Sequence, residues 1–80
     1  MLNQYALIHR QVGQFFFEHF PDADYHILRI HTNAETVYPS MRLVCHHTVH
    51  VRRGNEERHR IATIDETPDG LVLRGELNPL

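Results

Sequence analysis

The sequence predicts an α+β domain in which one N-terminal amphipathic helix packs on a four-stranded antiparallel sheet. Three observations lead to this prediction. Apolar residues recur at helical spacing up to residue 20, they alternate with polar residues from residue 25 onward, and two glycine-containing turn signals divide the alternating part. A chain of 80 residues is long enough for one small domain. We therefore expect a single domain over residues 1–80, with the helix at about 3–20 and the sheet at about 25–77.

The N-terminal segment has a helix start signal, a helix stop signal and one apolar face. Asn3 is a suitable N-cap, and Pro21 disfavours helical geometry at the residue before it. The apolar face expected at about 100° per residue consists of Tyr5, Ile8, Val12, Phe15, Phe16 and His19, with Phe20 at its edge. We expect this face to cover the sheet. His19 is then a histidine of the core edge with one ring nitrogen bonded to the backbone, or else a pH-sensitive group.

Phe17 lies outside this apolar face, about 100° from Phe16 and on the side of Arg10. A large aromatic side chain next to an arginine is a common anchor at protein interfaces. Single exposed apolar residues are also common on monomers. Phe17 is therefore expected either to contact a partner or to pack at the edge of the core.

Four strands are predicted after the helix, at about residues 25–32, 36–52, 57–65 and 71–77. Residues 33–35 are expected to form the first turn. Pro39 then marks an edge, a bend or a bulge in the second strand, because proline cannot donate to a ladder. The Gly54-Asn55 pair suits a hairpin loop, and residues 67–70 combine a proline of fixed φ with a glycine that is free to take positive φ.

Residues 41–52 alternate between two sets of side chains, which places each set on one face of a strand. The set expected to face inward is Met41, Leu43, Cys45, His47, Val49 and Val51. The set expected to face outward is Arg42, Val44, His46, Thr48, His50 and Arg52, joined by Arg74 from the last strand. Because one helix covers only one face of the sheet, we expect the outward set to form an open face rich in arginine and histidine.

Positive charge is concentrated between residues 42 and 60. This segment holds five of the eight arginines and four of the eight histidines, and the chain has no lysine. Its formal charge is +3, against −5 for the rest of the chain, which together make the net charge of −2. Arginine pairs with carboxylates and phosphates through a planar fork of donors. The pattern therefore indicates recognition rather than catalysis.

We predict that partner binding uses the arginines and histidines of this segment, with a helix aromatic as an additional anchor. The predicted contacts are Arg42, His46, His50, Arg52, Arg53, Arg58, Arg60 and Phe17. A second, acidic surface is expected in the loops, where it either imitates a row of phosphates or is simply solvated. Its residues are Asp22, Asp24, Asp65, Glu66 and Asp69.

Signals for catalysis and for metal binding are weak. Cys45 shares its predicted strand face with His47, but that face is apolar and a buried cysteine behaves as a small hydrophobe. Gly-rich phosphate loops and Gly-x-Ser-x-Gly elbows are absent. On a strand, His46 and His50 lie roughly 13 Å apart, too far to share one ion. We expect no enzyme activity, no cofactor and no dedicated metal site, with a cross-strand site that includes His31 or His59 as the metal hypothesis left open.

The chain is expected to be cytoplasmic and not membrane-bound. It has a single cysteine, no basic segment followed by an apolar run at its start, and no apolar stretch approaching about 20 residues. Both a monomer and a homodimer are compatible with the pattern. The second strand, if it lies at the sheet edge, would pair with its copy to make a dimer, although Pro39 would interrupt that edge.

In size and format, the chain resembles small phage-encoded inhibitors, including anti-CRISPR proteins, which are short, single-domain, cofactor-free and often α+β. The resemblance covers the whole chain in format and rests on no single motif. It implies binding to a CRISPR effector complex and blocking of its engagement with target DNA.

The sequence therefore predicts a non-enzymatic protein-binding module, a small inhibitor that covers a functional surface of a larger protein or ribonucleoprotein complex. The alternative is a small nucleic-acid-binding module that uses the same arginines on phosphates. Against this alternative, a pI near 6.4 is lower than that of a dedicated nucleic-acid binder. A histidine-based metal-binding protein is the third hypothesis.

Overall fold

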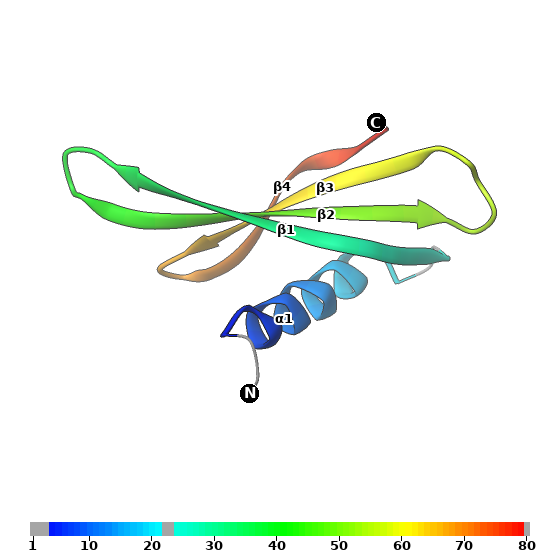
Figure 1. Cartoon of the computed structure of the whole chain (residues 1–80), viewed down its shortest axis with the longest axis horizontal. Helices are drawn as coiled ribbons and strands as arrows, with labels where there is room; N and C mark the ends of the chain where they lie inside the picture. Colours follow the sequence, from blue (N-terminus) through cyan, green and yellow to red (C-terminus); the bar gives the residue numbers. More distant parts are fainter. Residues whose placement is uncertain (1–3, 22–23, 80) are drawn as a thin grey trace.

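A computed structural model describes residues 4–21 and 24–79 of the chain. One helix lies against a four-stranded antiparallel sheet whose strands follow one another in the order of the sequence (Figure 1). The elements are α1 (Gln4–His19), β1 (Tyr25–Val37), β2 (Arg42–Arg53), β3 (His59–Thr67) and β4 (Gly70–Pro79). The predicted fold class is confirmed, with β1 and β4 as the two edge strands.

The predicted apolar face of α1 packs on the sheet. Val12 and Phe16 are fully buried, and Ile8, Phe15 and Phe20 are partly buried around them. The core that they join also contains Val49, Val51, Ala62 and Ile64 from the two central strands. Two sequence predictions, the N-cap Asn3 and the side chain of Tyr5, lie outside the part that the structure describes. No helix in the described part of the chain is long and apolar enough to cross a membrane.

His19 is exposed, so its predicted place at the core edge is wrong. Its Nδ1–H donates to the carbonyl oxygen of Phe15 at 3.0 Å, which matches the expected bond from a ring nitrogen to the backbone. The space against the core belongs to Phe20, whose ring centroid lies 4.9 Å from Phe16 and 5.9 Å from Tyr25. Because Phe20 fills this space, His19 is left at the surface.

The turn between β1 and β2 lies at residues 38–41 and not at the predicted residues 33–35. The pairing of β1 with β2 continues through the predicted turn, where Asn33 pairs with His46 and Glu35 pairs with Val44. Pro39 follows a cis peptide bond and lies in the turn, where its missing N–H costs no ladder hydrogen bond. β2 is an internal strand, so the condition for a dimer through the second strand is not met, and the two edge strands are β1 and β4.

β3 and β4 run beyond their predicted ends, to Thr67 and Pro79. Asp65 and Glu66 are therefore strand residues and not loop acids, which corrects the predicted acidic loop surface; of that predicted surface, Asp22 lies outside the described residues. The turn between the two strands, at residues 68–69, is confirmed. Gly54 in the β2–β3 loop has a φ of 52°, the left-handed conformation that a hairpin glycine permits.

The cross-strand register gives the sheet an inner face toward α1 and an outer face away from it. The inner-face pairs His47–Ile64 and Val49–Ala62 are buried. Residues between them in sequence point to the outer face, over which no other element of the described chain packs. The register places Arg42, His46, His50, Arg52 and Arg74 on this outer face, as the sequence alternation predicts.

Candidate functional site

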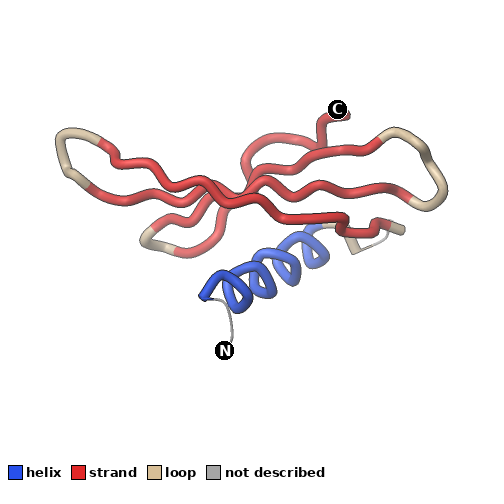
Figure 2. Tube along the Cα trace, viewed as in Figure 1, coloured by secondary structure: helices blue, strands red, loops and turns tan. Residues whose placement is uncertain are grey.

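The end of the β1–β2 hairpin exposes a group of apolar side chains, which we call the hairpin tip: Val37, Tyr38, Met41 and Leu43. Tyr38 is 73% exposed, Leu43 65% and Met41 62%. Met41 and Leu43 are predicted to face inward, yet they have no cover because the hairpin extends beyond the end of α1 (Figure 2). Beside the tip, a depression of about 220 Å³ lies between the start of β2 and the β3–β4 turn.

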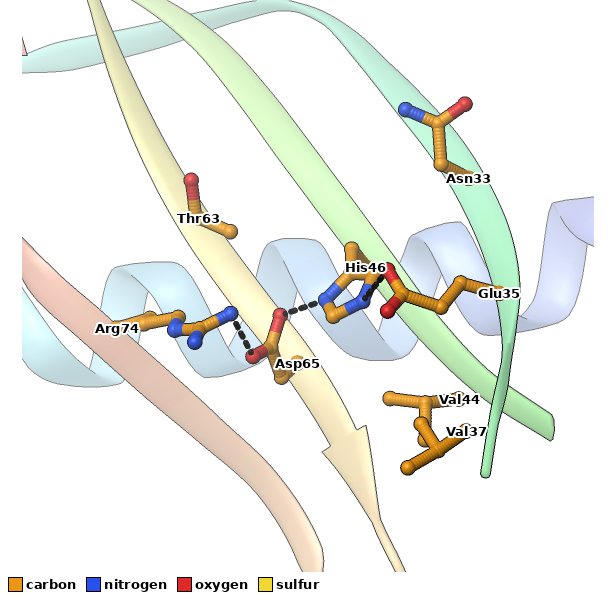
Figure 3. A pocket seen from close by; sticks show the side chains of 8 residues that line it. All are labelled: Asn33, Glu35, Val37, Val44, His46, Thr63, Asp65 and Arg74. Atoms are coloured by element: carbon orange, nitrogen blue, oxygen red, sulfur yellow. Dashed lines mark hydrogen bonds and ion pairs between the residues drawn. The ribbon is translucent and has the colours of Figure 1, made fainter. Parts of the chain in front are cut away.

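Four charged side chains, one from each strand, form a row across the middle of the outer face (Figure 3). We call Glu35, His46, Asp65 and Arg74 the central ladder. His46 donates from Nδ1 to Oδ1 of Asp65 at 2.7 Å and from Nε2 to Oε2 of Glu35 at 3.2 Å. Arg74 donates to the other oxygen of Asp65 at 3.2 Å. The ladder lines an open depression of about 580 Å³ and ties all four strands together.

His46 is a charged group within the central ladder. Both of its ring nitrogens face carboxylate oxygens, which only accept hydrogen bonds, so both nitrogens carry hydrogens. The hydrogen bond to Asp65 raises the pKa of His46 above its usual value of 6.5, and the Glu35 contact raises it further, against the opposing effect of burial. With His46 protonated, the two cations of the ladder balance its two carboxylates.

The outer face carries a second cluster where β2 meets the β2–β3 loop, which we call the basic end: Arg29, His50, Arg52 and His59. In the register Arg29 lies opposite His50, and Arg52 lies opposite His59. A depression of about 350 Å³ is lined by Arg29, His50, His59 and the half-exposed Leu28. Burial lowers the pKa of His50, and the positive charges of Arg29, His31 and His59 lower it further. The basic end is therefore a region of positive electrostatic potential.

A chain of hydrogen bonds crosses the inner face from α1 to β3, and we call its four members the buried chain: His9, Thr32, His47 and Glu66. Nε2 of His9 lies 2.7 Å from Oγ1 of Thr32, which lies 2.8 Å from Nδ1 of His47. Nε2 of His47 lies 2.8 Å from Oε1 of Glu66. His47 is only 1% exposed, so the buried chain satisfies both ring nitrogens of a core histidine.

The direction of the buried chain follows from its carboxylate end. Glu66 only accepts, so His47 donates to it from Nε2. When the ring carries this hydrogen alone, its Nδ1 accepts from the Thr32 hydroxyl. The oxygen of Thr32 then accepts from Nε2–H of His9. Burial, and after it the nearby His47, lowers the pKa of His9.

The arrangement of Thr32, His47 and Glu66 has the order hydroxyl, base and orienting carboxylate that nucleophilic catalysis uses. Its geometry is nevertheless that of a packed core. The Thr32 oxygen already contacts two histidines, and His47 is buried between α1 and the sheet. His46 on the outer face likewise has both nitrogens bonded to carboxylates. Both ring nitrogens of each histidine are therefore hydrogen-bonded within the protein in this conformation.

The predicted contact residues do not form one patch. Arg42 lies beside the hairpin tip, His46 belongs to the central ladder, and His50 and Arg52 belong to the basic end. Arg42 and Arg52 are ten residues apart along β2. This separation corresponds to roughly 33 Å at the rise of a strand.

The other predicted contacts lie off the outer face. Arg53 ends β2, and Arg58 is exposed in the β2–β3 loop. Arg60 lies at an inner-face position of β3, opposite Val51, and donates to Glu56 at 3.3 Å. Phe17 is 43% exposed on α1, outside the packed face as its helical position predicts.

Four residues of these sites are missed by reasoning from the sequence: His9, Arg29, Thr32 and Glu35. Asp65 and Glu66 are singled out from the sequence but are placed in a loop surface instead of on β3. A signal for two of them is present, because Arg29, His31, Asn33 and Glu35 occupy every second position and so indicate one continuous strand face. The predicted turn at residues 33–35 hides this alternation.

In the part of the chain that the structure describes, no group of three or more His, Cys, Asp or Glu side chains is placed to hold a metal ion. Comparison with protein-family models, with curated proteins and with solved structures finds no match to this chain. Conclusions about its function therefore rest on the geometry of the hairpin tip, the central ladder and the basic end.

Proposed function

We propose that this protein is a non-enzymatic protein-binding module, a small inhibitor that attaches to a larger partner through its hairpin tip and the adjoining outer face. The observation that supports this most strongly is the grouping of exposed apolar side chains at the hairpin tip. The register places Val37 on the outer face and Leu43 on the inner face, on either side of the turn that carries Tyr38 and Met41. Exposed apolar side chains gathered at one place on a small protein are typical of an interaction site.

The hairpin tip has the composition of an interface centre. Tyrosine and methionine are enriched at the centres of protein interfaces, and Tyr38 and Met41 are both largely exposed at the turn. Arg42 lies between Met41 and Leu43 in sequence and supplies a charged group at the rim. The depression beside the tip gives a partner side chain a place to enter.

The central ladder supports the hairpin as a preorganised element. Glu35 and His46 link β1 to β2 just below the tip, and Asp65 anchors His46 to β3. An element that is ordered before binding loses less conformational entropy when the complex forms. This favours a rigid hairpin that inserts into a partner surface.

The format shared with anti-CRISPR inhibitors gives one specific version of the proposal, in which the partner is a CRISPR effector and target-DNA engagement is blocked. Its support is the size and α+β format of the chain. In this version the captured complex contains a guide RNA, and added protein lowers the binding of target DNA by the purified effector. A partner that lacks RNA would exclude this version and leave the general proposal in place.

The proposal is tested by changing the tip and measuring partner capture. The double variant Tyr38→Ser/Met41→Ser is compared with the wild-type protein in capture from nuclease-treated bacterial lysate, quantified by mass spectrometry. We expect a protein partner that the wild type retains and the double variant loses by about tenfold or more, because interface-centre aromatic side chains contribute most of the binding free energy.

The matched control is Leu7→Ser, which removes a side chain that is 66% exposed on α1, away from the tip. This control should capture the partner as the wild type does. Circular dichroism checks that all variants are folded. Equal capture by the tip variant, or the loss of every protein partner after nuclease treatment, would contradict the proposal.

A further inference from the structure

The basic end brings together cations from three strands that are far apart in the sequence. Arg29 comes from β1, His50 and Arg52 from β2, and His59 from β3. The register places His26 opposite Arg52 as well, so the cluster continues to the start of β1. Arg29, His50 and His59 line a depression of about 350 Å³, and Arg52 follows His50 by two positions on the same face of β2.

Asp24 pairs with His26 at 3.6 Å, at the start of β1. The other ion pairs of the described side chains belong to His46, His47, Arg60 and Arg74. Among the carboxylates whose side chains the structure describes, none pairs with Arg29 or Arg52. Within this described set, the donors of both arginines face no carboxylate.

Among the side chains that the structure describes, the groups around His50 are basic or uncharged. β1 presents Arg29 and His31 to it, β3 presents His59 and the opposing Ile61, and its own strand adds Thr48 and Arg52. An anion bound among these groups would reverse the charge repulsion that lowers the pKa of His50. Binding of an anion should therefore be accompanied by proton uptake.

We propose that the basic end binds the phosphate groups of a single nucleic-acid strand, with Arg29 and Arg52 as its fixed cations and His50 and His59 as additional hydrogen-bond donors. The arginine fork matches the geometry of phosphate oxygens. His50 and Arg52 repeat along β2 at about 7 Å, which suits a chain of phosphates better than a lone ion. Leu28, 43% exposed at the rim, provides an apolar contact for a sugar or a base.

This site is distinct from the hairpin tip and does not depend on the proposed function. Arg52 lies at the opposite end of β2 from Arg42. The β1–β2 and β2–β3 loops accordingly lie at opposite ends of the molecule (Figure 2). Failure of nucleic-acid binding would therefore leave protein capture through the tip unaffected, and the reverse also holds.

The test measures the binding of a fluorescently labelled oligo-deoxythymidine strand of about 20 nucleotides by fluorescence anisotropy at low salt. We expect binding at about pH 5.5 that weakens by about tenfold at about pH 7.5, because protonated histidines add phosphate contacts. The double variant Arg29→Gln/Arg52→Gln should bind at least about tenfold more weakly. Its salt slope should fall by about one for each arginine removed.

Two further variants distinguish binding at this site from a general effect of the protein's net charge. Arg10→Gln/Arg42→Gln removes the same charge from α1 and from the tip side of β2, and it should bind as the wild type does. His50→Gln/His59→Gln should keep the binding seen at about pH 7.5 and lose most of the increase at acid pH. Thermal unfolding checks that each variant is folded.

Four results would overturn the proposal. The first is no binding of the strand at either pH, and the second is equal weakening by the two arginine double variants. The third is binding of a phosphoserine peptide at these residues when the oligonucleotide does not bind, which would assign the site to a phosphoprotein. A duplex that binds more tightly than the single strand would likewise overturn the choice of a single strand.

Discussion

His46 couples the stability of this protein to pH through its contacts with Asp65 and Glu35. Because these contacts raise its pKa in the folded state, the folded protein holds the proton more tightly than the unfolded chain does. The resulting stabilisation is complete below the usual histidine pKa of 6.5 and is lost as the pH rises through the raised folded-state pKa. At the residue scale, the central ladder is therefore strongest in mild acid.

The variant His46→Gln tests this coupling. It should lower the free energy of unfolding by about 1 kcal/mol at about pH 5.5, the scale of a partly exposed charged hydrogen bond. The difference from the wild type should shrink as the pH rises through the raised folded-state pKa of His46. Urea unfolding over a series of pH values measures this change. A difference that stays the same across the series would show that His46 is not charged in the folded ladder.

At the scale of elements, the buried chain attaches α1 to the sheet by polar contacts as well as by apolar packing. His9 lies on α1, whereas Thr32, His47 and Glu66 lie on three successive strands. A buried polar group that loses its partner costs more than the net gain from one hydrogen bond. The hydroxyl of Thr32 joins the two histidines, so this one atom links α1 to β1 and β2.

The variant Thr32→Val keeps the shape of the side chain and removes this link. We expect a loss of about 1–3 kcal/mol in the free energy of unfolding, because Nδ1 of the buried His47 is left without its hydroxyl partner. Thr36→Val is the matched control, since Thr36 is exposed on the same strand and should change stability by less than about 0.5 kcal/mol. Urea unfolding of both variants decides the point. Equal losses would show that the buried chain does not contribute to stability.

At the scale of the whole molecule, which is about 44 Å long, the two proposed binding sites lie at opposite ends of the β1–β2 hairpin. One end of the hairpin presents the apolar tip, and the other end presents Arg29 and Arg52. The central ladder occupies the outer face between them. An inhibitor built in this way would bind a protein surface at one end and a nucleic-acid strand at the other, as a ribonucleoprotein partner requires.

The two ends should be separable by mutation. Tyr38→Ser/Met41→Ser should abolish protein capture and keep oligonucleotide binding within about twofold of the wild type, since independent sites more than about 10 Å apart show nearly additive effects. Arg29→Gln/Arg52→Gln should show the reverse pattern when capture is measured after nuclease treatment. Anisotropy and capture on the same protein preparations test this directly. Loss of both activities in either variant would indicate a single continuous interface.

Local patterns in the sequence determine the elements of this protein. The change from helical spacing to alternation gives one helix followed by strands, and proline and glycine place the turns near residues 54 and 68–70. The same alternation assigns His46, His50 and Arg52 to the outer face. These features depend on neighbouring residues alone, because backbone geometry sets the period of each element.

Only the tertiary structure decides how these elements meet. The β1–β2 ladder continues through residues 33–35, which moves the turn to Pro39, because the pairing of Glu35 with Val44 depends on register between distant segments. The same register brings Asp65 to His46 and Arg29 to His50, and helix packing brings His9 to Thr32. Cross-strand contacts of this kind join residues that no local period relates. The fold class therefore follows from the sequence, whereas the central ladder, the buried chain and the separation of the two ends follow from long-range pairing.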